Sequence, residues 1–600
     1  MTDGQPTIPA NDYVVKDPEA FARNMARAAE AMGKAASAWL APRERGEVVD
    51  EPSANASDMV QTLNQVALHW LSDPRLAMQA QTRLMTAGFR VWSDSMSRMM
   101  SDNVEEPKRD RRFADEEWTR NLFFDLLRRA YGATVELSKE FVLEAENLDE
   151  RTRQKAEFYV EQVAAAIAPS NFLLTNPEAL KRTVATNGEN LAEGFKMLAE
   201  DLERGRGNLK LRQADGSNFE LGRNIAVTPG RVIARNALCE IIQYEAQTDE
   251  VSKRPLVIVP PWINKFYILD LNREKSFIDW AVKQGHTVFV ISWAQPDERH
   301  AKLDWSDYSR DGIGFALDAA ERASGTNEFN SIGYCVGGTL LAATLALHAK
   351  RGDERIRSVT LFTTQVDFQH AGDLKVFVDE EQLAALERRM ERKGYLDGGE
   401  MATAFNMLRA RDLIWSNVVN NYMLGKSPPA FDLLHWNSDS TRMSAANHSY
   451  YLRNCYLNNA LTGGDMVLDG ETLDLSAVTI PVYNLATRED HIAPAKSVYE
   501  GSKAFGGPVT YVMSGSGHIA GVVNPPAKKK YQFWTGPEPS DAVSFEDWAE
   551  AATETPGSWW EHWHAWTERQ DGERVPARKI GGDGLEPLEE APGLYVRVKA

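Results

Sequence analysis

A cysteine between two glycines is the most reactive-looking group in this sequence of 600 residues. The pentapeptide Gly333-Tyr334-Cys335-Val336-Gly337 joins a strand-like apolar run to a helical one. In such a turn the glycines allow close packing, and the central side chain sits at the start of the helix. There the helix dipole and the free N–H groups favour a thiolate and a developing oxyanion. The pattern predicts Cys335 as a nucleophile, and the alternative is a small buried cysteine in a glycine-rich turn.

A candidate acid and a candidate base follow later in the chain. Asp490 comes directly after the strand-like run PVYNLAT, and His518 follows the next such run, VTYVMSG, in a Gly-Ser-Gly turn. The order nucleophile, acid, histidine is that of the α/β-hydrolases. Both residues lie where strands end, which is where an open α/β sheet places its ligands. We therefore predict a triad with Cys335, although Glu489 and Asp367 compete for the role of the acid.

The triad needs donors for a developing oxyanion. We expect one from the Val336 N–H, at the start of the helix, and a second from the loop Pro260–Lys265 after an earlier strand. That loop has no run of glycines, so the Ile263 N–H is only the most reasonable choice for the second donor.

Three other residues of reactive type are interpreted as structural. His491 adjoins Asp490 but is not set in a glycine turn, so we interpret it as structural. Cys239 lies in an apolar strand pattern and Cys455 in a helical one, and both are predicted to be core residues.

The choice of cysteine as nucleophile indicates acyl transfer. An acyl group on cysteine is a thioester, so transfer from a thioester donor costs little and leaves the acyl group activated for a second step. This favours an acyltransferase that acts on acyl-CoA over a hydrolase.

The composition excludes several classes of protein. A net charge of −19 argues against a general nucleic-acid binder, and a hydrophobic content of 43% argues against wholesale disorder. Three cysteines are too few for a disulfide framework or a structural zinc site, so we expect a reducing, cytosolic compartment, no metal and no cofactor. Residues 538–600 hold 14 acidic and 6 basic residues, so −8 of the charge lies in this tail.

The pattern of segments predicts two regions. Residues 1–214 have apolar side chains at helical spacing, whereas strand-like and helical runs alternate through 215–600. Alternation of this kind predicts a mostly parallel sheet covered by helices. It stops over residues 368–477, which we interpret as a helical cap inserted into the α/β domain.

Two parts of the sequence are candidates for a signal or membrane segment, and neither fits. The N-terminus has no basic start and no apolar run, so no secretory signal is expected. The uncharged stretch 329–349 is broken by glycines and is better explained as a buried strand, turn and helix.

Two features near the end of the chain have open interpretations. Four tryptophans, at positions 559, 560, 563 and 566, mostly share one helix face, which either docks on the catalytic domain or contacts another apolar surface. The run 528–530 of three lysines is either a solvated charge cluster or a contact for CoA phosphates.

Several stretches together resemble the polyhydroxyalkanoate synthases. They are GYCVGGT from Gly333 and six others: PSNFLLTNPE from Pro169, VPPWINKFYILDL from Val259, HTVFVISW from His286, FDLLHWNSDST from Phe431, YLRN from Tyr451 and SGHIAGVVNPP from Ser516. The resemblance runs from about Arg120 to Gly593, and residues 1–110 carry no motif that we can match. The length and the ending GSWWEHWHAW are similar to class I enzymes, which need no second subunit.

The resemblance implies an α/β-hydrolase-like catalytic domain and a residue-by-residue mechanism. Cys335 matches the nucleophile that carries the growing chain, His518 the general base, and Asp490 the acid that helps His518 activate the substrate hydroxyl. The substrate would be a short-chain (R)-3-hydroxyacyl-CoA, typically 3-hydroxybutyryl-CoA. The enzyme would be a homodimer on cytoplasmic polyester granules, with phasins as neighbours. Trp436 matches a family position without a physical role that the sequence reveals.

Two other functions remain open at this point. A cysteine-dependent thioesterase or lipase on the same fold would release free 3-hydroxy acid instead of polymer. A non-catalytic granule scaffold would have a decayed site, against which the intact Cys335, Asp490 and His518 argue.

Overall fold

The computed structural model describes residues 13–48, 54–99 and 110–600 and divides into two compact units. The helical unit comprises residues 1–215 and 405–430, and the sheet unit comprises 216–404 and 431–600. The insertion that we expected over 368–477 is thus shared between the units, because its middle part packs with the N-terminal helices. Among the described residues, no helix is long and apolar enough to cross a membrane.

The helical unit contains eight α-helices and two π-helical segments among its described residues. They are α1 (Pro18–Glu44), α2 (Ala54–Leu71), α3 (Pro74–Met99), α4 (Glu117–Arg120), α5 (Leu122–Leu143), α6 (Glu150–Ala166), α7 (Pro177–Ala185), α8 (Glu189–Arg204), η9 (Arg411–Trp415) and η10 (Val418–Met423).

Local sequence explains where these helices begin. The Asp17 side chain accepts hydrogen bonds from the N–H groups of Glu19 and Ala20, and Pro18 occupies the first turn of α1. Asp149 caps α6 through the Thr152 N–H in the same way. These side chains satisfy N–H groups that have no partner within the helix.

Small side chains let the segment 405–430 approach α8 closely. A Cβ added to Gly194 would lie 2.2 Å from the Tyr422 carbonyl oxygen. The Tyr422 hydroxyl donates to Asp201 at 2.7 Å, and the Asn190 side chain donates to the Met423 carbonyl at 2.6 Å. These long-range bonds explain why the segment belongs to the helical unit, which the periodicity of its sequence does not reveal.

The sheet unit is built on a ten-stranded sheet in the order β1-β2-β5-β4-β6-β7-β12-β13-β14-β15. The six strands from β5 to β13 run parallel, and the outer strands are antiparallel. The strands of this sheet are β1 (Gly230–Arg235), β2 (Cys239–Tyr244), β4 (Leu256–Val259), β5 (Val288–Trp293), β6 (Phe329–Tyr334), β7 (Ile356–Phe362), β12 (Val482–Thr487), β13 (Val509–Ser514), β14 (Gln532–Thr535) and β15 (Thr553–Pro556).

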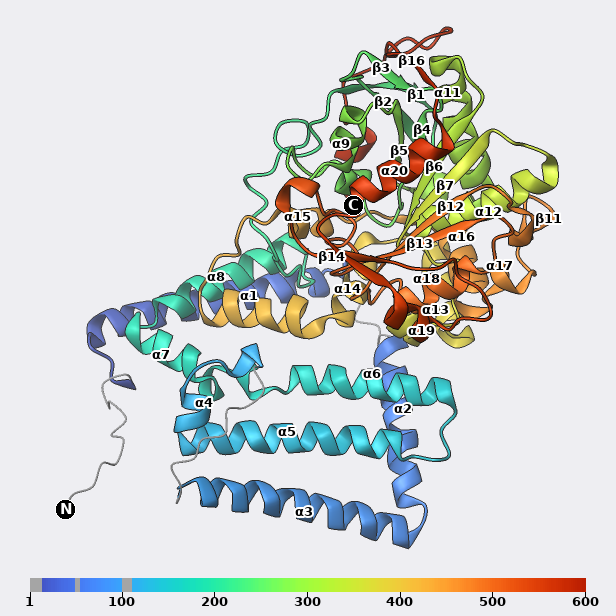
Figure 1. The fold of residues 1–600 in the computed structure, drawn as a ribbon. Coiled ribbons are helices and arrows are strands. Elements are labelled where there is room, and N and C mark those ends of the chain that lie inside the picture. The colour runs from blue at the N-terminus through green and yellow to red at the C-terminus, as the bar shows by residue number, and fades with distance from the viewer. Residues whose placement is uncertain (1–12, 49–53, 100–109) are drawn as a thin grey trace. The chain divides into compact units, whose positions relative to one another are not determined.

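Helices such as α9, α12 and α20 lie beside this sheet, as Figure 1 shows. The α-helices of the sheet unit are α9 (Phe277–Lys283), α10 (Trp305–Asp307), α11 (Phe315–Ser324), α12 (Val336–Arg351), α13 (Glu380–Lys393), α14 (Gly398–Leu408, which crosses into the helical unit), α15 (Asp432–Ser438), α16 (Ala445–Tyr451), α17 (Ala460–Gly463), α18 (Ala495–Ser502), α19 (Phe545–Ala551) and α20 (Trp560–Gln570). Short paired strands complete the unit: β3 (Glu250–Ser252) with β16 (Arg574–Pro576), β8 (Tyr395–Leu396) with β9 (Met443–Ser444), and β10 (Val467–Leu468) with β11 (Glu471–Thr472).

The core of the sheet unit receives the tryptophan-rich face of α20. Trp560 and Trp563 are fully buried, and Trp563 donates its indole N–H to Thr360 on β7 at 2.9 Å. Full burial of an aromatic side chain is worth about 2–3 kcal/mol. The face therefore docks within the sheet unit, which is the first of the two interpretations that the sequence left open.

Candidate active site

Cys335 occupies a strained turn between β6 and α12. Its φ of 53° and ψ of −130° place a non-glycine residue in a region that L-amino acids avoid. A Cβ on Gly337 would lie 2.4 Å from the Pro260 carbonyl oxygen, and one on Gly333 would lie 2.4 Å from the Gly338 Cα. The glycines are thus required by close packing, and the cysteine is the residue directly before the first turn of α12.

The predicted acid and base meet at the carboxyl edge of the parallel strands. His518 Nδ1 lies 2.7 Å from Asp490 Oδ2, and both side chains are almost completely buried. The other carboxylate oxygen accepts the N–H groups of Ile492 and Ala493 at 2.8 and 2.9 Å. Asp490 is therefore fixed by the backbone, and it orients the imidazole by holding Nδ1.

The electrostatics of His518 favour its charged form. Burial by itself lowers the pKa of His518, but the charges of Asp490 and Cys335, and the hydrogen bonds to both, raise that pKa to about 10. An imidazolium next to the thiol stabilises a thiolate, which is the nucleophilic form of cysteine. Transfer of the thiol proton to His518 therefore gives a thiolate beside an imidazolium, which is the arrangement needed for attack on a carbonyl.

Aromatic side chains hold the loop that carries His518. The Tyr334 hydroxyl donates to the His518 carbonyl at 3.2 Å, and the two rings lie nearly parallel with centroids 5.8 Å apart. The indole N–H groups of Trp559 and Trp560 donate to the carbonyls of Gly521 and Val522, each at 2.9 Å. Sequence reasoning missed these contacts, and the helical spacing of the tryptophans was the only signal.

The loop after β4 lies against the cysteine turn, as the contact between Gly337 and Pro260 shows. Val336, the first residue of α12, presents an N–H that a helix leaves unpaired. The Thr441 hydroxyl donates to the Ile263 carbonyl at 2.7 Å, and the Trp436 indole donates to the Lys265 carbonyl at 2.8 Å. Trp436 therefore has the physical role that the sequence did not reveal: it supports the loop that contains Ile263.

The remaining candidates lie outside this arrangement. Asp367 accepts the Gln369 N–H at 2.7 Å, so another interaction engages it. Cys239 and Cys455 are fully buried, and burial raises the pKa of both thiols. Lys528 forms an ion pair with Glu274.

In the part of the chain that the structure describes, one cluster has donor atoms that could hold a metal ion: His286, His564 and Glu568 lie within 4.8 Å of one another. The two imidazoles share a hydrogen bond of 3.2 Å, and Glu568 pairs with Arg574 at 2.8 Å. His286 precedes β5, so the cluster lies at the opposite edge of the sheet from Cys335 and takes no part in the chemistry there.

Comparison with known proteins finds relatives along most of the chain. Residues 109–281 match the family profile described as the N-terminus of poly-beta-hydroxybutyrate polymerase (PhaC), and residues 254–525 match the alpha/beta hydrolase fold. The chain is 63% identical to the poly(3-hydroxyalkanoate) polymerase subunit PhaC of Rhizobium meliloti, over 98% of this chain and 96% of the relative. It is 55% identical to the poly(3-hydroxyalkanoate) polymerase of Methylorubrum extorquens, over 97% and 98% of the two chains. It is 41% identical to the PhaC subunit of Cupriavidus necator, over 82% and 84%.

Proposed function

Because the chain belongs to the poly(3-hydroxyalkanoate) polymerases, and is thus an acyltransferase on an α/β-hydrolase fold, we propose that it polymerises short-chain (R)-3-hydroxyacyl-CoA through a thioester on Cys335. The preferred substrate is 3-hydroxybutyryl-CoA. The observation that carries the proposal is the buried His518–Asp490 pair beside a cysteine held in a strained turn.

Acylation is the first step. His518 takes the proton of the Cys335 thiol, and the thiolate attacks the carbonyl carbon of the acyl-CoA. The N–H groups of Val336 and Ile263 stabilise the oxyanion that forms. The C–S bond to CoA then breaks, and the imidazolium returns its proton to the CoA sulfur, which leaves as a thiol.

Chain growth is the second step. His518, oriented by Asp490, accepts the proton of a substrate 3-hydroxyl, and the hydroxyl oxygen attacks the thioester on Cys335. An ester bond forms, and the cysteine sulfur leaves and takes the proton back from His518. The lengthened chain is then a thioester of CoA, and it acylates Cys335 again as in the first step. Because an ester is more stable than a thioester, the second step is favourable, which explains why a thiol serves better here than a hydroxyl.

The cellular location, oligomeric state and partners of the enzyme are also proposals. We place the enzyme in the cytoplasm, as a homodimer at the surface of polyester granules with phasins nearby, with CoA as part of the substrate and no separate cofactor. Exposed apolar side chains on α2 and α3 support contact with a polyester surface: Leu68, Leu71, Met85 and Phe89 are each more than 60% exposed.

The test is a Cys335→Ala variant incubated with (R)-3-hydroxyacyl-CoA of graded chain length. We expect CoA release and polymer to be lost, with a decrease of at least about 10³-fold in rate, because the nucleophile is gone. The matched control is Cys455→Ala, which removes a buried thiol and should keep the parent rate. Near-parent CoA release by Cys335→Ala would refute the mechanism. Free 3-hydroxy acid without polymer from the parent protein would instead show a thioesterase.

A further inference from the structure

A buried ammonium group holds the loop that contains Ile263. We propose that Lys265 is a positioning residue, which fixes the geometry of the oxyanion site by joining this loop to two segments far away in the chain. One segment is the strap, defined here as residues 436–441, and the other is residues 596–598. The inference rests on the proposed thioester mechanism, because it concerns where that mechanism stabilises negative charge.

The ammonium of Lys265 has three acceptors for its three N–H donors. Nζ lies 2.8 Å from Asp439 Oδ1, 2.8 Å from the Val596 carbonyl oxygen and 2.9 Å from the Val598 carbonyl oxygen. The Lys265 side chain is 6% exposed. A buried charge of this kind is tolerated only when it is paired and its donors are satisfied. The three bonds therefore define one position for the side chain.

The strap also forms hydrogen bonds with the main chain of the same loop. Its Trp436 indole donates to the Lys265 carbonyl at 2.8 Å, so the main chain and side chain of Lys265 are both held. The second oxygen of Asp439 accepts the Tyr267 hydroxyl at 2.9 Å. Thr441 donates to the carbonyl of Ile263 at 2.7 Å. The loop, the strap and residues 596–598 thus form one bonded assembly with Lys265 at its centre.

This assembly matters for catalysis because an oxyanion donor acts over a narrow range of distance. A donor must lie about 2.7–3.1 Å from the developing oxyanion, and loss of one donor costs about 10²–10³-fold in kcat. A displacement of about 1 Å can cost about 100-fold. Ile263 is two residues from Lys265. Release of the Lys265 side chain should therefore let the Ile263 N–H move out of hydrogen-bond distance of the oxyanion.

The first experiment compares Lys265→Met with the double variant Lys265→Met/Asp439→Asn. We expect the single variant to lose about 10–100-fold in kcat for CoA release, with KM within about threefold, because the loss concerns the transition state. The single variant also leaves the Asp439 charge buried without its partner, so its Tm should fall. The double variant removes that charge, so its Tm should recover while kcat stays low. Recovery of kcat together with Tm would overturn the proposal and leave Lys265 a purely structural role.

A second experiment does not depend on how well the methionine variant folds. A chain that ends at Lys599 keeps both carbonyl acceptors as peptide groups, whereas a chain that ends at Tyr595 removes them. We expect the first to keep the parent kcat and the second to match the loss in Lys265→Met. Equal rates for the two truncated chains would contradict the proposal. Failure of the thioester mechanism itself would appear separately, as activity of Cys335→Ala.

Discussion

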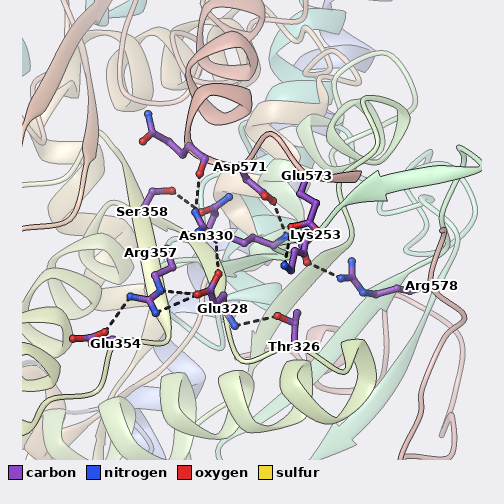
Figure 2. A network of polar contacts seen from close by, with 12 residues as sticks. Lys253, Thr326, Glu328, Asn330, Glu354, Arg357, Ser358, Asp571, Glu573 and Arg578 are labelled. Carbon is purple, nitrogen blue, oxygen red and sulfur yellow. Dashed lines mark hydrogen bonds and ion pairs between the residues drawn. The ribbon is translucent and has the colours of Figure 1, made fainter. Parts of the chain in front are cut away.

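The two edges of the parallel sheet use their polar side chains in opposite ways. At the carboxyl edge, Cys335, Asp490 and His518 are arranged around a strained turn. At the amino edge, the segment after α20 is bound to the strand ends by a network of ion pairs and hydrogen bonds (Figure 2). The same sheet thus carries the candidate reacting groups at one edge and a network that joins distant segments at the other.

Several charged groups at the amino edge are paired with one another. The Arg254 N–H donates to Asp571 at 2.7 Å, and its guanidinium bonds Glu328 at 3.0 Å. Arg578 donates to the Lys253 carbonyl at 2.6 Å, and the Lys253 ammonium pairs with Glu573 at 2.7 Å. These bonds join the segment after α20 to the ends of the strands, so we interpret them as structural.

At the carboxyl edge the partners are arranged for a proton to move. One carboxylate oxygen of Asp490 accepts main-chain N–H groups, and the other lies against His518. His518 lies between Asp490 and the thiol of Cys335, so a proton on the imidazole can pass to a leaving group. Substitutions at the two edges should therefore separate activity from stability.

The largest effect is expected for Asp490→Asn. The neutral amide cannot stabilise the imidazolium or fix its tautomer, so CoA release should decrease by about 10³–10⁴-fold. The matched control is Glu489→Gln, which changes the exposed neighbour and should keep the parent rate. If both variants lost activity equally, the acid at this edge would be wrongly assigned.

The same variant should change how stability depends on pH. In the parent, the pKa of His518 is raised to about 10, above its ordinary value of about 6.5. The stabilisation from this shift is complete below pH 6.5 and is lost as the pH rises through 10. Without the Asp490 charge the pKa of His518 should fall, so less stability should be lost as the pH rises. Urea unfolding of both proteins between pH 6.5 and 10 measures this, and identical pH profiles would contradict the assigned cause.

An intermediate effect is expected for Trp560→Phe compared with Trp563→Phe. Each variant removes one buried indole bond, so each should lower the free energy of unfolding by about 1 kcal/mol or more. Of these two residues, Trp560 bonds the loop after His518 through the Val522 carbonyl, whereas Trp563 bonds Thr360 in the sheet. We therefore expect about a tenfold lower kcat in Trp560→Phe alone, from misplacement of the base. Equal kcat values in the two variants would show that α20 only stabilises the fold.

Much of the reactive edge could be predicted from sequence because its signals are local. The glycines around Cys335, and the strand ends before Asp490 and His518, predicted the residues that the structure brings together, and the α/β-hydrolase fold is confirmed. The supports could not be predicted, because they join residues far apart in the chain. Lys265 is bonded to Val596, and Trp436 to Lys265, and neither pair has a sequence pattern that indicates the contact.

The domain organisation shows the same limit. The sequence predicted that the interval 368–477, which includes residues 405–430, is mainly helical, but it does not say which surface the apolar side chains of this part cover. Tyr422 and Asn190 decide this through contacts in the helical unit. The expected cap over 368–477 assumed that a continuous insertion stays with one unit, and the structure divides it.

The smallest effect is expected at the amino edge, for Lys253→Met. The Lys253 and Glu573 side chains are 43% and 62% exposed, and such a pair contributes little to stability because water screens it. We expect the midpoint of urea unfolding to be only slightly lower than that of the parent at low salt and the difference to vanish at about 1 M salt, where charges are screened beyond a few ångströms. CoA release should stay at the parent rate, since this edge carries no reacting group. A rate loss of tenfold would show that the two edges are coupled through the strands, and the separation of activity from stability would then fail.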